Sequence, residues 1–102
     1  MIDDRTLPSK VVVEAGLGSI GKIKIIRALA QEGKMATIYF LHKKTGLKRE
    51  DIKNNLSDLV KIGWVKQAKY ASVMYGIGEN EQVTRLVQFF HDVGYISGHN
   101  QQ

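Results

Sequence analysis

The sequence of 102 residues predicts a single, mainly α-helical domain with one small β-hairpin and a C-terminal amphipathic helix. The length fits one small domain, and a hydrophobic fraction of 43% is sufficient for one core. Apolar residues recur at helical spacing in four segments, whereas the segment before the last of these alternates apolar and polar residues. The predicted order is therefore three helices, a hairpin and a fourth helix.

We divide the chain into an N-terminal arm or lead-in (1–17), a central domain (18–78), a C-terminal helix (79–96) and a disordered tail (97–102). The run at residues 11–14 is largely β-branched and apolar. It is too short for periodicity to separate a strand from a helical lead-in, so both alternatives stay open.

The first two predicted helices are marked by residues that start and stop helices. Ser19 and Thr37 are favoured N-caps because their hydroxyl oxygens accept a hydrogen bond from a backbone N–H of the first turn. Gly33 and Gly46 follow the last turns, where glycine readily adopts a left-handed conformation. The first helix carries an apolar stripe formed by Ile23, Ile26, Leu29 and Ala30.

The third predicted helix has the clearest apolar stripe, formed by Ile52, Leu56, Leu59 and Val60. Glu50 and Asp51 lie in its first turn, where the helix dipole favours acidic side chains, and Gly63 ends it. The residues that follow are rich in aromatic and β-branched types. We therefore expect a hairpin whose strands span about 64–70 and 72–77.

The formal net charge is +5, and its distribution along the chain is uneven. Residues 43–69 contain eight basic and three acidic residues, whereas the remainder of the chain contains seven of each. A localised basic surface indicates a polyanionic partner, with nucleic acid as the first candidate. A lysine-rich solvated face is the alternative interpretation.

A glycine-rich stretch, VVVEAGLGSIGKIKII, overlaps two phosphate-binding patterns. Gly16, Gly18 and Gly21 have the spacing of a dinucleotide-binding turn, and Lys22 adds most of a P-loop. However, Ile23 stands where a P-loop needs a hydroxyl group for magnesium, and the chain lacks the alternating strands and helices that carry either motif. The sequence therefore predicts no nucleotide cofactor.

Two plainer roles are expected for the same glycine-rich stretch. Gly16 and Gly18 would let the chain turn before the first helix, and Gly21 would permit a close approach between elements. As a minor hypothesis, free amides at the helix start and Lys22 would together hold a nucleic-acid phosphate.

No metal, membrane or catalytic site is predicted. The chain has no cysteine, and His42, His91 and His99 lack the short spacings of zinc ligands. No apolar run approaches the roughly 18 residues of a membrane span, and the polar N-terminus does not resemble a secretory signal. No serine or carboxylate pair is placed beside a candidate base. These features favour a cytoplasmic protein that is not an enzyme.

The segment GLKREDIKNNLSDLVKIGWV resembles the recognition-helix segment of winged helix-turn-helix regulators. The shared anchor residues, which align without a gap, are Gly46, Leu47, Ile52, Leu56, Leu59, Gly63, Trp64 and Val65. GKIKIIRALAQEG is similar to the first helix of archaeal members, and the hairpin with GENEQVTRLVQFF resembles their wing and C-terminal helix. The resemblance covers about residues 18–96. It implies a nucleoid-associated regulator of transcription that binds double-stranded DNA.

The resemblance also implies which residues contact DNA. It places the recognition helix (about 48–62) in the major groove and the wing (about 64–77) on the DNA backbone. Lys53 and Asn54 lie opposite the apolar stripe and Arg49 lies at the tip of the helix, so these three are candidates to read bases. The complete predicted set, in which Asn55 is a weaker member because it lies closer to the buried side, is Lys43, Lys44, Lys48, Arg49, Lys53, Asn54, Asn55, Lys66, Lys69 and Tyr70.

The last predicted helix begins after Asn80, ends at Gly94 and has more apolar residues than one core-facing stripe needs. Winged helix-turn-helix regulators of this type commonly dimerise through such helices, so the resemblance implies a homodimer. The predicted interface consists of Val83, Leu86, Val87, Phe89, Phe90, Tyr95 and Ile96. The alternative is that the stripe within residues 83–90 simply caps the core of a monomer.

Two other functions stay open at this point. Winged helices also serve as protein–protein interaction modules of the transcription machinery. A non-specific, chromatin-like DNA binder would use the same backbone contacts as a specific regulator.

Overall fold

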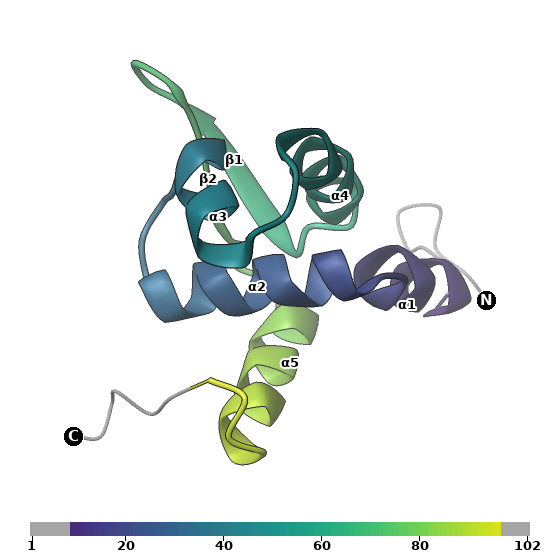
Figure 1. The fold of residues 1–102 in the computed structure, drawn as a ribbon. Helices are drawn as coiled ribbons and strands as arrows, with labels where there is room; N and C mark the ends of the chain where they lie inside the picture. Colours follow the sequence, from purple (N-terminus) through teal and green to yellow (C-terminus); the bar gives the residue numbers. More distant parts are fainter. Residues whose placement is uncertain (1–8, 97–102) are drawn as a thin grey trace.

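The structure, a computed structural model, describes residues 9–96. The described elements, in chain order, are α1 (Ser9–Leu17), α2 (Ile20–Glu32), α3 (Ile38–Thr45), α4 (Arg49–Lys61), β1 (Val65–Lys69), β2 (Val73–Ile77) and α5 (Glu81–Asp92) (Figure 1). The predicted order of three helices, hairpin and helix is confirmed as α2 to α5, and α1 precedes it. The predicted tail (97–102) and the start of the predicted arm (1–8) lie outside the described residues.

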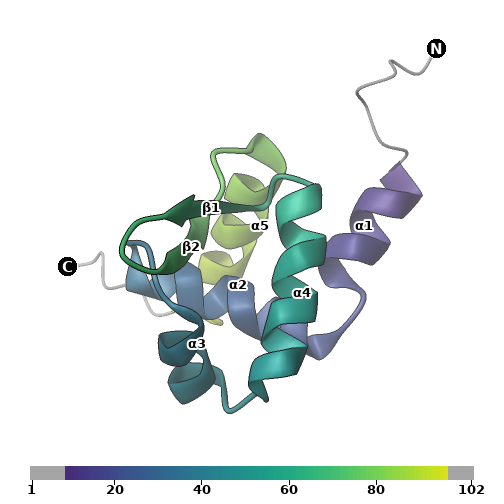
Figure 2. The ribbon, with the colours of Figure 1, turned by 90° about the horizontal axis from the view of Figure 1, so that it is seen from above.

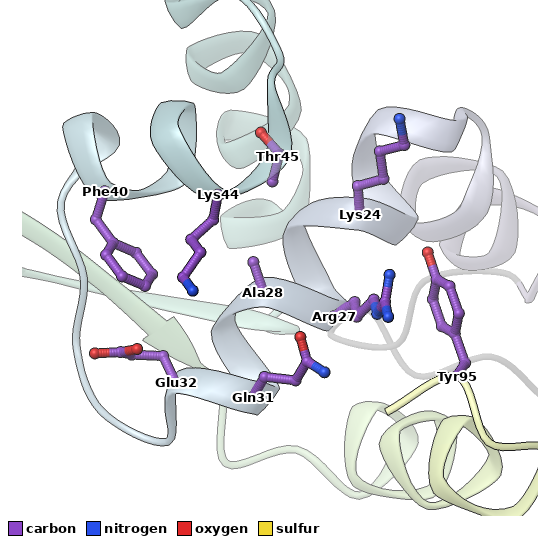
Figure 3. Close-up of a pocket in the computed structure, with 9 residues that line it drawn as sticks. All are labelled: Lys24, Arg27, Ala28, Gln31, Glu32, Phe40, Lys44, Thr45 and Tyr95. Atoms are coloured by element: carbon purple, nitrogen blue, oxygen red, sulfur yellow. The ribbon is translucent and has the colours of Figure 1, made fainter. Parts of the chain in front are cut away.

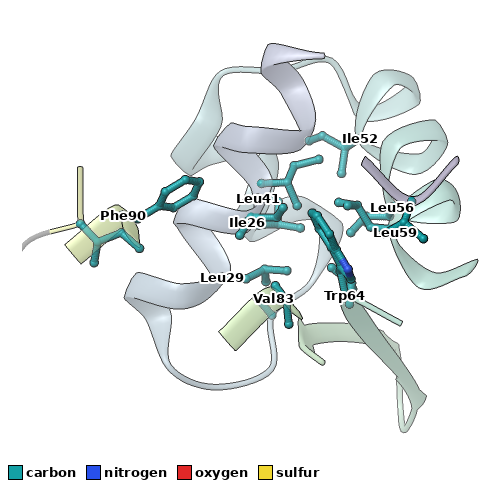
Figure 4. Packing of buried hydrophobic residues seen from close by; sticks show 14 residues of the cluster. Ile26, Leu29, Leu41, Ile52, Leu56, Leu59, Trp64, Val83 and Phe90 are labelled. Carbon is teal, nitrogen blue, oxygen red and sulfur yellow. The ribbon is translucent and has the colours of Figure 1, made fainter. Parts of the chain in front are cut away.

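Helix α2 is the centre of the fold. It crosses the middle of the molecule with α3 and α4 on one side and α5 on the other (Figure 1), and it packs against α1, α3, α4, β2 and α5. Ile25, Ile26 and Leu29 of α2 are fully buried. Side chains from every helix and from the hairpin meet around them in one hydrophobic cluster (Figure 4), so one core fixes the relative positions of all the elements.

The predicted caps are confirmed. Ser19 Oγ accepts a hydrogen bond from the Lys22 amide at 3.3 Å, and Thr37 Oγ1 accepts one from the Phe40 amide at 3.1 Å. Gly33 and Gly46 end α2 and α3 with φ angles of 73° and 77°, the left-handed conformation that favours glycine. Local residue choice therefore defines the ends of these helices.

The hairpin is antiparallel, with a register that runs from Val65 opposite Ile77 to Lys69 opposite Val73. A contact that the sequence did not predict anchors it. The Ala36 amide donates to the Tyr75 carbonyl oxygen at 2.7 Å, and the Tyr75 amide donates back at 2.8 Å. Because Ala36 lies between α2 and α3, this pairing holds the hairpin against the helices.

The run at residues 11–14 is helical, as one of the two alternatives proposed, and α1 continues through Gly16. The prediction that Gly16 lets the chain turn was therefore wrong. A Cβ atom at Gly16 would overlap the indole ring of Trp64, which is only 5% exposed. Gly21 likewise faces the amide nitrogen of Asn55, which confirms the prediction of a close approach there. These two glycines serve packing between elements.

Candidate nucleic-acid interface

Helix α4 has one buried and one exposed face. Ile52, Leu56 and Leu59 are buried in the core. In the view from above, α3 and α4 lie in front of α2, with the hairpin beside them (Figure 2). The exposed polar residues of α4 are Arg49, Glu50, Asp51, Lys53, Asn54, Ser57 and Lys61, so two acidic side chains lie in the first turn beside the basic ones. The three residues predicted to read bases, Arg49, Lys53 and Asn54, are therefore on the surface of one helix and available to a partner.

Tyr39 of α3 joins this surface, although sequence reasoning missed it. Its side chain is 57% exposed, and its ring centroid lies 5.7 Å from Lys43 Nζ and 5.6 Å from Arg49 Cζ. The two cation–π contacts bring basic groups from α3 and α4 to one ring. The sequence does contain one signal that could have identified Tyr39. This residue lies four residues before Lys43, and the spacing places both residues on one helical face.

Lys44 does not join the same surface. Its Nζ atom lies 5.9 Å from the Phe40 ring centroid, and the side chain extends from α3 toward α2 (Figure 3). Lys43 and Lys44, which were predicted together as phosphate contacts, therefore point in different directions, and a phosphate contact by Lys44 stays a prediction. Consecutive residues on a helix point about 100° apart, so a pair of neighbouring lysines cannot face one partner equally.

Asn55 also lies apart from the exposed face, as its position near the buried side suggested. The Ser19 hydroxyl donates to Asn55 Oδ1 at 3.5 Å, and the half-buried Asn55 amide rests against Gly21. This side chain fastens α4 to the start of α2. It is a structural contact, and we remove Asn55 from the candidate interface.

Lys22 is buried, which overturns the hypothesis that it holds a phosphate. The residue is 8% exposed, and its Nζ atom forms an ion pair with Asp58 Oδ2 at 2.9 Å. Its backbone amide donates a hydrogen bond to Ser19 Oγ and is therefore not free to bind a phosphate. The pair ties α2 to α4 and leaves no cation for a nucleic acid.

The Lys22–Asp58 pair gives an asymmetric prediction for stability. Asp58→Asn is expected to lower the free energy of unfolding by about 1–3 kcal/mol, because it leaves a buried ammonium group without its partner. Lys22→Met should cost less, because the side chain of Asp58 is 45% exposed and remains solvated. Urea denaturation measures both. DNA affinity should be the same for Lys22→Met and the native protein, and a selective loss of affinity would restore the phosphate hypothesis.

The residues that the hairpin adds to the candidate interface lie mainly at its tip. Tyr70 is 68% exposed in the turn, next to the exposed Lys69. Lys66 lies at the other end of β1, where its Nζ atom is 3.4 Å from Glu79 Oε2, so its charge is partly offset. The predicted wing residues are thus divided between the tip, with Lys69 and Tyr70, and the base, with Lys66, and all three are exposed.

A hollow of about 250 Å³ separates α4 from the hairpin. Its polar lining consists of Lys53, Ser57, Lys61, Gln67 and Tyr75. Gln67 Nε2 donates to the Tyr75 hydroxyl at 3.4 Å. Gln67 and Tyr75 were not among the predicted residues, because only the packing of hairpin against helix brings them beside Lys53. The hollow makes the exposed face of α4 continuous with the hairpin.

The apolar residues predicted as a dimer interface fall into two groups. Val83, Phe90 and Ile96 are 0%, 6% and 2% exposed, so they belong to the core of the monomer and offer almost no surface to a partner. The core-cap alternative, which concerned the stripe within residues 83–90, is correct for Val83 and Phe90, whereas Ile96 was expected outside that stripe and is nevertheless buried. Leu86, Val87 and Tyr95 are partly buried against the core. Phe89 is 56% exposed and remains available.

Neither a membrane span nor a metal site is found in the described part of the chain. No helix within residues 9–96 combines the length and the apolar character that crossing a bilayer requires. Over the same residues, histidine and acidic side chains form no group of three or more that could hold a metal ion.

Three packed helices, with an exposed third helix followed by an antiparallel hairpin, define a winged helix-turn-helix fold. The structure is similar to HlyU from Vibrio cholerae N16961, with a TM-score of 0.70 and 20% identity over 83% of this chain and 89% of that chain. The structure is also similar to NolR from Sinorhizobium fredii, with a TM-score of 0.70 and 16% identity over 87% of this chain and 86% of that chain.

A third similar structure is a homodimeric winged helix-turn-helix DNA-binding domain, Mb0332 from Mycobacterium bovis, described as a possible ArsR-family transcriptional regulator. It has a TM-score of 0.64 and 21% identity over 90% of both chains. No family model matches this sequence, and no curated protein matches it. At these identities the similarity establishes the fold.

Proposed function

We propose that this protein is a homodimeric regulator of transcription that binds double-stranded DNA. The observation that carries the proposal is the exposed polar face of α4. This face lies between the hairpin and the contacts of Tyr39 with Lys43 and Arg49. It belongs to the segment 43–69, which holds the net positive charge. Its dimensions suit a major groove, which admits one α-helix. The similarity to Mb0332, a homodimeric winged helix-turn-helix DNA-binding domain, supports the same function.

Each part of the interface has a proposed role. Arg49, Lys53 and Asn54 read base edges, since arginine and lysine pair with guanine and asparagine with adenine. Residues beside them hold phosphates and position the helix. This second group consists of Tyr39, Lys43, Lys48, Lys61, Lys69 and Tyr70.

The function is tested by fluorescence anisotropy of the protein on a random duplex of about 30 base pairs, at several salt concentrations. Neutralising about four phosphates should give a slope near −3.6 in log affinity against log salt. Selection from a random library would then define the preferred half-site. Absence of binding at low salt overturns the proposal and favours a protein–protein interaction module that uses the same face.

We place the dimer contact on the outer face of α5. Phe89 and Val93 are 56% and 59% exposed, and their spacing of four residues puts them on one side of the helix. A twofold dimer predicts a near-palindromic DNA site with half-sites about 34 Å apart or a multiple of that distance. We propose a cytoplasmic, nucleoid-associated protein. An archaeal origin stays a prediction from the sequence, since the similar structures come from bacteria.

Phe89→Glu combined with Val93→Glu should dissociate the dimer, because the contact would then bury carboxylates without partners. Sedimentation equilibrium measures the dissociation constant, which we expect to rise more than about tenfold. Arg85→Glu, on the same helix and 77% exposed in its side chain, is the control and should leave the dimer intact. A dimer that survives the double substitution places the contact elsewhere.

A further inference from the structure

A second polar feature lies on α2, away from the exposed face of α4. A cavity of about 260 Å³ opens between α2, α3 and the turn after α5 (Figure 3). Three basic side chains, Lys24, Arg27 and Lys44, line it together with the rings of Phe40 and Tyr95. Small-molecule sites are concave and combine apolar walls with a small number of polar groups that fix the orientation of the ligand.

The charge of the cavity is not balanced by the protein. Glu32 is its one acidic lining residue, and Glu32 Oε2 lies 3.8 Å from Lys34 Nζ, outside the cavity. Among the salt bridges within residues 9–96, none includes Lys24, Arg27 or Lys44. The cavity therefore has an excess of positive charge that a ligand can neutralise.

Arg27 is held in position without an acidic partner. Its Cζ atom lies 4.4 Å from the centroid of the Tyr95 ring, and its Nε atom is shielded from water and lacks a hydrogen-bond acceptor. Stacking on the ring leaves the edge of the guanidinium group for a ligand. Guanidinium N–H groups form paired hydrogen bonds with carboxylate and phosphate oxygens. A side chain that is already ordered loses little entropy on binding.

We propose that this cavity binds a small organic anion, a phosphate monoester or a carboxylate with a flat apolar body. Arg27 and Lys44 face the cavity from α2 and α3 and receive the charged oxygens, and Lys24 adds a third positive charge. Phe40 and Tyr95 contact the apolar body. A cavity of about 260 Å³ is too small for a DNA duplex, and none of its lining residues belongs to α4, so this site is separate from the interface on α4.

Amide NMR of the free protein, titrated with phenyl phosphate or with benzoate at constant ionic strength, tests the proposal. Saturable shifts are expected for the amides of Arg27, Lys44 and Tyr95, and the probe that saturates at the lower concentration identifies phosphate or carboxylate as the preferred class. Inorganic phosphate should bind more weakly because it lacks the apolar body. Shifts that stay linear with concentration overturn the proposal.

Two variants locate the binding. Arg27→Met keeps the aliphatic stem and should weaken the preferred probe by about tenfold or more, the value of one hydrogen bond to a charged group. Lys24→Met, at an exposed position that folding does not require, should weaken it less. Arg85→Met on α5 makes the same change outside the cavity and should have no effect. Equal affinities for Arg27→Met and Arg85→Met contradict the proposal. These measurements use no DNA, so they are informative even if the DNA-binding proposal fails.

Discussion

Replacement of both Lys53 and Asn54 by alanine is expected to weaken binding to the preferred duplex by roughly 10- to 100-fold, since one good base contact contributes about 1–3 kcal/mol. Both side chains are exposed on α4, opposite the buried stripe of Ile52, Leu56 and Leu59. Their removal creates no cavity, so the free energy of unfolding should stay within about 0.5 kcal/mol of the native value. Fluorescence anisotropy and urea denaturation of the same preparations separate the two quantities.

The adjacent asparagines provide a matched control for this experiment. Asn54 is exposed, whereas Asn55 accepts a hydrogen bond from Ser19 and packs on Gly21. Asn55→Ala should therefore lower stability and leave DNA affinity unchanged, the reverse of the expectation for Asn54→Ala. Equal losses of affinity for the two single variants would show that α4 does not face the groove as proposed.

Binding to unrelated duplexes gives a further distinction. Lys53→Ala with Asn54→Ala should reduce affinity for the preferred duplex more than for random DNA, because phosphate contacts carry the non-specific affinity. Lys43→Ala should instead weaken all duplexes alike and reduce the salt slope by about one. A protein in which both variants behave identically is a non-specific, chromatin-like binder.

The ends of the elements could be predicted because local chemistry defines them. Ser19, Thr37 and Asn80 accept backbone hydrogen bonds within three residues of themselves, and Gly33 and Gly46 adopt φ angles that other residues avoid. Such interactions depend on a few consecutive residues and can be recognised in one sequence. The same is true of the apolar stripe that turns α4 toward the core.

Contacts between distant residues were not predictable in this way. Lys22 and Asp58 are 36 residues apart, and their ion pair exists because α2 and α4 cross at that point. In sequence, Lys22 completed most of a P-loop pattern, and its burial and its ion pair with Asp58 exclude the separate hypothesis that it holds a nucleic-acid phosphate. Tyr39 and Arg49 meet through the turn between α3 and α4. A helical wheel considers each helix alone, so it assigns all four residues an incomplete environment.

Helix α5 shows a different limit of prediction from the sequence. Its apolar residues exceed one stripe, and of the surplus residues Phe89, Tyr95 and Ile96 only Phe89 is largely exposed. Periodicity did not separate the exposed surface from the core, since Ile96 follows the helix and folds back into the monomer. The turn after α5 also brings Tyr95 onto Arg27, and this return of the chain forms one wall of the anion cavity.

Gly16→Ala is expected to destabilise the protein, although helix propensity predicts the opposite sign. Alanine in the interior of a helix is favoured over glycine by about 1 kcal/mol. At Gly16, however, the new Cβ atom would overlap the indole ring of Trp64, and overpacking of a core costs about 1–3 kcal/mol. The indole cannot move away easily, because its Nε1 donates to Gln82 Oε1 at 3.0 Å and the residue is almost fully buried.

A double-mutant cycle identifies the contact responsible. Trp64→Leu alone removes a buried ring and should lower the melting temperature, but it also vacates the space beside Gly16. In that background Gly16→Ala should be neutral or stabilising, which gives a coupling free energy of about 1 kcal/mol or more. Thermal unfolding measures all four proteins, at about 4–8 °C per kcal/mol for a domain of this size. If Gly16→Ala stabilises the native protein, α1 does not pack on Trp64. If the coupling appears, a glycine that matched a nucleotide-binding pattern in the sequence is retained for the close approach of a helix to a tryptophan.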